Sequence, residues 1–256
     1  MLTNASEIAA GSKFFSEVWG GAEDVVPVDI AIASGHAGGY FSAAYDPKGD
    51  LVAASYGFVG RFGNQSTIHS HVTASNAAGA GFALKMHQRE WARIQGFDAI
   101  TWTFDPLVRR NCVFNLDKLG AEAVEYLINF YGEMHDELNR GEQSDRFFAV
   151  WRTREQNLIL PVTANSNAAT LIRIGEVEAP VTAESINEHI DAKLPFKIYL
   201  PADIEALRVS SPQVARQWRL SVRDALHPSF ESGAVVRQIV DDRQALLVEW
   251  PSEGAK

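Results

Sequence analysis

Two histidines separated by a single residue, His69 and His71, are the side chains best suited to acid–base chemistry in this sequence. They lie in a stretch typical of a β-strand, where residues two apart point to the same face. A histidine near its ordinary pKa can accept a proton at neutral pH, so the pair is our first candidate for a general base. Two alternatives stay open: the imidazoles could only stabilise the strand face, or they could bind zinc with Asp105 as a third ligand. No ligand spacing supports zinc, so we predict no metal site.

A glycine-containing loop follows the histidines and opens a helix. Gly79 and Gly81 stand at the start of an amphipathic segment, and glycine lets the backbone approach a ligand closely. Backbone N–H groups at a helix start can hold phosphate, because they point outward and the helix dipole favours negative charge there. The loop therefore predicts an anion site made of main-chain donors.

A strand, a helix and a second strand are needed to position these residues. Hydrophobic periodicity predicts a strand over residues 67–73, a helix over residues 81–95 and a strand over residues 99–103. Further elements are predicted around this core: a helix over 5–19, strands over 27–33, 40–45 and 51–59, a helix over 109–119, and strands over 122–129 and 146–151. This order predicts a mixed α/β fold.

The C-terminal part continues after a polar stretch near residues 153–168 that reads as a linker. The elements predicted there are strands over 171–177 and 196–200, a helix from Ala183, a helix over 212–226, and strands over 234–240 and 245–250. We therefore predict two domains, residues 1–153 and residues 154–256, the second an α/β extension packed on the first.

Composition limits the classes of function. The chain has 256 residues, of which 46% are hydrophobic, and its net charge is −9. An acidic chain is a poor partner for nucleic acid, because phosphate contacts need clustered lysine and arginine. A single cysteine, Cys112, excludes an internal disulfide and a cysteine-based metal cluster. With no signal-peptide pattern and no membrane-spanning run, we expect a cytoplasmic protein without a membrane partner.

Several segments together resemble one family. HSHVT at 69–73, LKMHQREWA at 84–92, TWTFDPLVRRN at 101–111, FNLDKLGA at 114–121 and NFYGEM at 129–134 are similar to a little-characterised subfamily of the GNAT-type N-acetyltransferases. IYLPADIEAL at 198–207 resembles that subfamily's C-terminal part, so the resemblance covers most of the chain. It implies a largely antiparallel sheet with helices on both faces, splayed after its fourth strand, and a C-terminal α/β extension.

The resemblance also implies a cofactor site. In this family, acetyl-CoA or another acyl-CoA is the co-substrate, and the loop binds its pyrophosphate through backbone amides. The implied contacts in this sequence lie along Val72, Thr73 and Ala74 for the pantetheine arm, at Ala78, Gly79, Ala80, Gly81 and Phe82 for the phosphates, and at Asn111. Backbone N–H groups of the fourth strand would polarise the thioester carbonyl. Exposed strand edges in this fold often pair between chains, so a homodimer is expected to be accessible.

The implied chemistry is direct transfer of an acyl group to a small-molecule amine. His71 or His69 would deprotonate the amine, and Asp105 is the second choice of base, although a structural role with Arg109 or Asn111 suits it better. Leu116 stands where many GNAT enzymes have a tyrosine that protonates the thiolate, and Tyr131 is the nearest substitute. The segment from His71 to Gly79 is also shorter than is usual in the subfamily. This short loop, the loss of the tyrosine and Asn76 in place of an arginine or glutamine fit an alternative: a non-catalytic GNAT-fold binding or assembly module with a shortened pyrophosphate loop.

Overall fold

The computed structural model describes residues 1–19, 25–132, 143–154 and 168–251. It has two compact units, one of Met1–Trp102 with a short stretch that begins at Arg152, and one of Thr103–Trp151 with the C-terminal part of the chain. The fold is mixed α/β, as the sequence predicted. The predicted domain boundary at residues 153–154 adjoins a stretch outside the described residues and stays a prediction.

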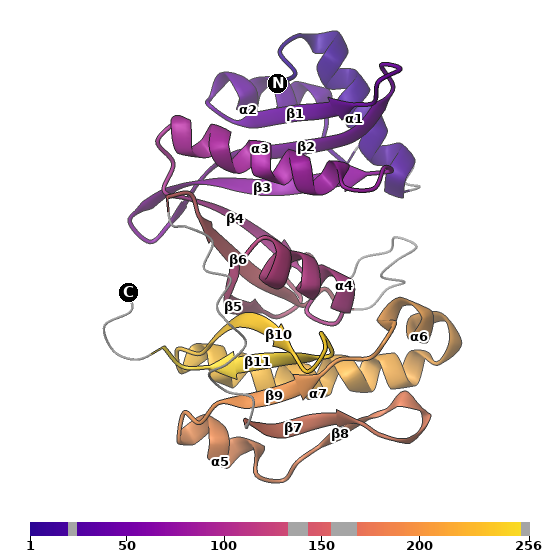
Figure 1. The fold of residues 1–256 in the computed structure, drawn as a ribbon, viewed down its shortest axis with the longest axis vertical. Helices are drawn as coiled ribbons and strands as arrows, with labels where there is room; N and C mark the ends of the chain where they lie inside the picture. Colours follow the sequence, from indigo (N-terminus) through magenta and orange to yellow (C-terminus); the bar gives the residue numbers. More distant parts are fainter. Residues whose placement is uncertain (20–24, 133–142, 155–167, 252–256) are drawn as a thin grey trace. The chain divides into compact units, whose positions relative to one another are not determined.

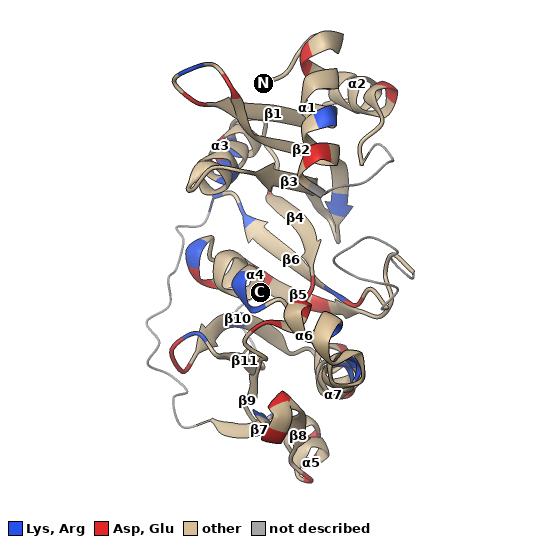
Figure 2. Cartoon of the chain, turned by 90° about the vertical axis from the view of Figure 1, so that its right-hand side faces the viewer, with Lys and Arg blue, Asp and Glu red and all other residues tan. Residues whose placement is uncertain are grey.

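The first unit is a sheet between two layers of helices. Its elements are α1 (Ala5–Trp19), α2 (Val28–His36), β1 (Tyr40–Tyr45), β2 (Leu51–Phe62), β3 (Gln65–Ser75), α3 (Ala80–Ile94) and β4 (Ala99–Phe104). β1, β2 and β3 pair antiparallel, and β4 pairs with β3 in parallel. α3 lies on one face of the sheet, and α1 and α2 lie on the other (Figures 1 and 2).

The core of this unit lies between the sheet and helices α1 and α2. Phe15 of α1 stacks on Phe41 of β1, with ring centroids 5.8 Å apart, and Phe41 meets Tyr56 of β2 edge to face. Val72 of β3 is buried in the same cluster. These contacts fix which face of β3 is turned toward α1, and so which face is left for α3.

The prediction of a strand over residues 27–33 was wrong, because this segment is the helix α2. The apolar residues at 28, 30 and 32 alternate as they do in a strand. Pro27 nevertheless starts a helix, since its carbonyl accepts the N–H of Ala31, and the small Ala31 is the residue that packs into the core. Ile30 and Ile32 remain exposed, so the alternation does not mark a buried strand face.

The strands of the second unit have the order β6-β5-β10-β11-β9-β7-β8. Its elements are α4 (Arg109–Cys112), the π-helix η1 (Val113–Lys118), β5 (Glu122–Leu127), β6 (Arg146–Arg152), β7 (Ala169–Ile174), the 3-10 helix η2 (Glu176–Glu178), β8 (Pro180–Thr182), α5 (Ile186–Asp191), β9 (Phe196–Tyr199), α6 (Ile204–Ser210), α7 (Pro212–Glu231), β10 (Val235–Val240) and β11 (Ala245–Glu249). α4 and η1 lie on one face of this sheet and α7 on the other (Figures 1 and 2).

Several features of the second unit differ from the sequence prediction. The strand predicted over residues 171–177 ends at Ile174, Val177 lies in the 3-10 helix η2, and strand β8 was not predicted. The helix predicted over residues 109–119 is a single α-helical turn followed by a π-helix. Helix α6 was not predicted, although Asp203 caps it by accepting the N–H of Ala206 at 3.0 Å. Both are short-range features that hydrophobic periodicity does not reveal, because neither segment is long enough to show a repeat.

Candidate functional site

Parallel pairing between β3 and β4 stops early. The ladder runs from the pair Thr67–Ala99 to the pair His69–Thr101 and ends there. β3 continues to Ser75. The second half of β3 therefore runs without register pairs to β4, at the point where the resemblance places the splay.

The register of β3 against β2 shows which backbone groups this half of the strand offers. Asn76 donates its N–H to the carbonyl of Val52 at 3.1 Å. Because alternate residues of a strand bond to the same neighbour, Thr73 directs its N–H and C=O away from β2. Val72 and Ala74 bury their side chains in the core instead. Of the three contacts expected for a pantetheine arm, Thr73 is the one with main-chain groups directed away from β2.

The loop that follows β3 presents main-chain donors. Gly79 precedes α3 with φ of 80°, and no side chain caps this helix start. The N–H groups of Ala78, Gly79, Gly81 and Phe82 have no acceptor in the part of the chain that the structure describes. Together they form the kind of concave donor cluster that binds phosphate oxygens.

Internal hydrogen bonds hold this loop in shape. The Ser75 hydroxyl donates to the carbonyl of Ala77 at 2.9 Å, and the N–H of Ala77 lies 3.3 Å from the same hydroxyl. Ala80 donates its N–H to Ala77 at 3.3 Å, so it is the one expected phosphate contact whose amide is already used. The donor cluster is therefore built by the loop's own turn and needs no side chain from elsewhere.

His69 and His71 lie on one face of β3, because both rings contact the ring of Phe58, with centroids 5.2 and 5.9 Å apart. His69 Nδ1 lies 3.1 Å from the Thr101 hydroxyl, beside the last pair of the ladder. Burial, with the charges of His71 and Lys85, lowers the pKa of His69 to about 4. Burial also lowers the pKa of His71. Both imidazoles are therefore neutral at pH 7, which is the form that accepts a proton.

Lys85 is a polar residue of this region that the sequence analysis missed. It is 5% exposed, and its Nζ donates to the Ser70 hydroxyl at 2.8 Å and to Gln88 Oε1 at 3.4 Å. The ammonium also lies 4.3 Å from the centroid of the Trp102 ring. Burial lowers the pKa of Lys85 to about 7. The helical repeat contained the signal, because positions 85, 88 and 92 of α3 share a face and Ala92 is buried.

Asp105, the second-choice base, is the centre of a buried arginine cluster in the second unit. Arg219 binds both of its oxygens at 2.9 and 2.7 Å, Arg208 donates at 2.7 Å, and Arg146 lies 3.9 Å away. Burial acts to raise the pKa of Asp105, but the three guanidinium groups outweigh it and hold this pKa well below its usual range. A carboxylate in these surroundings is a weak base, so they favour a structural role for Asp105. Its partners are these three arginines and not, as the sequence suggested, Arg109 or Asn111.

Tyr131 lies at the surface of the second unit. Its hydroxyl is 2.9 Å from the Thr103 hydroxyl, and the guanidinium of Arg146 lies 5.6 Å from the centroid of its ring. The side chain is 42% exposed, so the phenol can reach a ligand in solution without rearrangement. Its suggested role as a proton donor stays a prediction.

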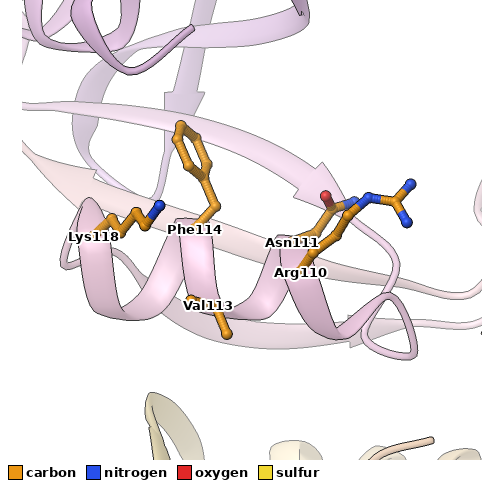
Figure 3. Close-up of a pocket in the computed structure, with 5 residues that line it drawn as sticks. All are labelled: Arg110, Asn111, Val113, Phe114 and Lys118. Carbon is orange, nitrogen blue, oxygen red and sulfur yellow. The ribbon is translucent and has the colours of Figure 1, made fainter. Parts of the chain in front are cut away.

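Asn111 opens onto a hollow beside the helical segment formed by α4 and η1. Asn111, Phe114 and Lys118 recur at the spacing of one helix face, and Leu116 is buried away from the surface. The neighbouring Arg110 is paired with Glu205 in a two-contact ion pair. The hollow has a volume of about 440 Å³ and is lined by Arg110, Asn111, Val113, Phe114 and Lys118 (Figure 3).

Among the residues that the structure describes, no group of three or more histidine, cysteine, aspartate or glutamate side chains is arranged to hold a metal ion. No helix among them combines the length and apolar character needed to cross a membrane.

The chain is similar to solved structures of acetyltransferases. A GNAT superfamily phosphinothricin acetyltransferase from Sinorhizobium meliloti, in complex with AcCoA, is 16% identical over 59% of this chain and 85% of that one, with a TM-score of 0.46. An N-acetyltransferase from Staphylococcus aureus Mu50 is 12% identical over 60% and 97%, with a TM-score of 0.47. The NatC complex bound to Gag peptide and CoA is 9% identical over 58% and 92%, with a TM-score of 0.44. No protein-family model and no curated protein matches the sequence.

Replacing Asp105 with asparagine is expected to destabilise the fold strongly. Asp105→Asn removes the charge that Arg208 and Arg219 share and leaves buried guanidinium groups uncompensated. Breaking a buried pair in this way costs about 3–5 kcal/mol, which urea unfolding at pH 7 will measure. The control is Glu125→Gln on an exposed position of β5, for which a change within about 0.5 kcal/mol is expected. An equal effect of the two substitutions would contradict the structural role of Asp105.

Lys85 is expected to make stability depend on pH. Its pKa is about 7 in the folded chain against 10.5 in the unfolded chain, so between these values the unfolded chain binds more protons. The cost of burying the charge is therefore full below pH 7 and is relieved as pH rises toward 10.5. Lys85→Met removes this cost, so its Tm advantage over the wild type should be largest near pH 6 and shrink toward pH 10.

Thermal unfolding of both proteins across this pH range measures the effect. Lys48→Met, at an exposed lysine in the turn between β1 and β2, is the matched control and should follow the wild-type curve. Parallel curves for the wild type and Lys85→Met from pH 6 to 10 would show that the buried amine does not titrate in this range.

Proposed function

We propose that this protein is an acyl-CoA-dependent N-acyltransferase that transfers an acyl group, acetyl in the first instance, to a small-molecule amine. The observation that carries the proposal is the donor cluster of the loop before α3. Four amides without acceptors in the described chain stand at a helix start, directly after the half of β3 that no longer pairs with β4. Acyl-CoA combines a diphosphate with an extended amide-bearing arm, and this pair of features suits both parts.

The chain's residues have distinct tasks in binding. The N–H groups of Ala78, Gly79, Gly81 and Phe82 bind the diphosphate oxygens, and the dipole of α3 adds to this attraction. Thr73 offers its N–H and C=O to the amides of the pantetheine arm, as a neighbouring strand would. Asn111 and Tyr131 belong to the second unit, and their contacts with the cofactor and the leaving group stay predictions.

The histidines serve the chemical step. A neutral imidazole of His71, with His69 as the alternative, takes a proton from the substrate ammonium, and the freed amine attacks the thioester carbonyl carbon. A new C–N bond forms, the C–S bond breaks, and the CoA thiolate leaves and is protonated. His71 is the more accessible of the two imidazoles. Main-chain N–H groups of β3 polarise the carbonyl as negative charge develops on its oxygen.

A binding module without activity is the competing interpretation. Leu116 supports it, because a buried leucine in η1 stands where many GNAT enzymes have a proton-donating tyrosine. The two interpretations agree on acyl-CoA binding and differ on turnover. A homodimer and a cytoplasmic location are further parts of the proposal, which sedimentation and localisation experiments address.

A negative charge in the donor cluster is expected to abolish cofactor binding. At Gly81, an added Cβ meets its nearest neighbour, the Cβ of Ser75, at 3.4 Å, so a side chain fits. Gly81→Asp should repel the diphosphate and weaken acetyl-CoA binding at least 10-fold, although aspartate in a first helical turn stabilises the helix. Calorimetry measures the affinity.

Gly81→Asn provides the matched control, because it has nearly the same shape without the charge. It should bind much more tightly than Gly81→Asp. Equal affinities for the two variants would rule out a diphosphate at this position, and no heat with the wild type at millimolar acetyl-CoA would remove the proposed function.

Loss of the imidazoles is expected to slow turnover without weakening cofactor binding. His71→Gln and His69→Gln, alone and together, should lower kcat by about 10²- to 10⁴-fold where the replaced group is the base. Release of free CoA thiol with a panel of primary amines measures turnover, and calorimetry measures acetyl-CoA affinity. His36→Gln, at an exposed position of α2, is the control. Undiminished turnover in the double variant would exclude both histidines as the base.

A further inference from the structure

The ring of Phe58 lies beside both candidate bases. Phe58 of β2 is the register partner of His69 on β3. Its ring centroid is 5.2 Å from that of His69 and 5.9 Å from that of His71. A general base must come within hydrogen-bond reach of the group it deprotonates, directly or through one water. Whichever imidazole is the base, an amine bound there therefore lies next to Phe58.

The Phe58 ring is open to solvent although it stands in a sheet. The side chain is 38% exposed. Its neighbours two positions away on β2 are Tyr56, which is buried, and Gly60, which has no side chain. A Cβ at residue 60 would lie 3.8 Å from the Cβ of His69, so Gly60 is on the same face as this imidazole. The glycine thus adds no side chain that could cover the ring on that side.

The surroundings of His71 are aromatic rather than charged. Its ring meets Tyr56 edge to face at 6.3 Å and lies against Phe58. Burial is the cause of its lowered pKa, and no carboxylate pairs with it in the part of the chain that the structure describes. The cation whose charge acts on His69 is Lys85, which is itself buried and donates to Ser70. Neither a second ammonium nor a carboxylate on the acceptor finds an exposed counter-charge among these groups.

We propose that Phe58 determines acceptor specificity and that the acceptor is a primary amine carried by an aromatic group. The acceptor's ring packs on the exposed part of Phe58, and this contact holds the amino nitrogen beside the imidazole that serves as base. Aromatic pairs with centroids about 4.5–7 Å apart are favourable beyond the area that they bury. The inference rests on the proposed function, because it names the substrate class of that site.

Turnover of three amines that share an aminoethyl group tests the substrate class. They are 2-phenylethylamine, β-alanine and 1,3-diaminopropane, which end in a phenyl ring, a carboxylate and a second ammonium. The wild type should have a kcat/KM for 2-phenylethylamine about 10-fold or more above the values for the other two. Equal values for the three amines, or a preference for one of the charged pair, would overturn the inference.

Substitution of Phe58 tests the residue itself. Phe58→Ala removes the aromatic surface, so the KM for 2-phenylethylamine should rise about 10-fold or more, with a smaller change in kcat and wild-type affinity for acetyl-CoA. Phe58→Tyr keeps the ring and should keep the wild-type KM, and Phe58→Leu covers the case in which the alanine variant does not fold. Tyr45→Ala, at an exposed aromatic position of β1, is the matched control. An equal rise in KM for β-alanine would contradict a role in specificity.

A binding measurement separates this inference from the proposed function. At constant pH, 2-phenylethylamine should shift the NMR signals of the His71 ring, with or without CoA, and β-alanine should not. The shifts should disappear in Phe58→Ala and persist in Phe58→Tyr. No shift in the wild type would overturn the inference. Retained shifts without acyl transfer would remove the proposed function alone and leave Phe58 as the contact of an aromatic amine.

Discussion

The structure of this protein depends on a parallel pair of strands, β3 and β4, whose register pairs end at His69–Thr101 although β3 continues to Ser75. A backbone N–H or C=O must find a partner in the protein or in solvent, and leaving it buried without one is costly. After the pair His69–Thr101, β3 has lost this partner on one side. The same sequence then supplies a loop with four further donors without acceptors in the described residues. An extended ligand that carries both amides and phosphates would satisfy the two sets together, and this is the ground on which we propose acyl-CoA rather than a compact anion.

Asp105 and Lys85, two buried charged residues of the described chain, have opposite surroundings. Asp105 is surrounded by three guanidinium groups that hold its pKa low, so it is a compensated charge that fixes the packing of the second unit. Arg219 of α7 binds both oxygens of this carboxylate, and the lysine and arginine positions of α7 are blue in Figure 2. Lys85 has no such counter-charge in the described chain, and burial lowers its pKa to about 7. Two histidines with lowered pKa values, His69 and His71, also lie on β3.

The sequence predicted the strand, loop, helix and strand of this region within two residues at almost every boundary, because each signal there is local. Periodicity marks α3 and β3, and glycine marks the turns. The prediction for residues 27–33 was wrong because their alternating pattern is typical of a strand, whereas Pro27 and the burial of Ala31 favour a helix.

The roles of individual side chains were harder to predict than the elements. Asp105 is bound by arginines more than 100 residues away in the sequence. The contacts of Lys85 with Ser70 and Trp102 likewise form only when the chain folds.

The departures from the GNAT pattern affect side chains, whereas the donor cluster is made by the main chain. Asn76 removes a long side chain that would face the phosphates, yet the N–H groups of Ala78, Gly79, Gly81 and Phe82 have no acceptor in the described structure. What the short loop does require is a turn with φ of 80° at residue 79. A Cβ at this position would meet nothing within 4 Å, so space does not demand glycine, and the backbone conformation alone does. The shape of the donor cluster therefore depends on the backbone conformation at Gly79 and on the Ser75 hydroxyl, both of which belong to the loop itself.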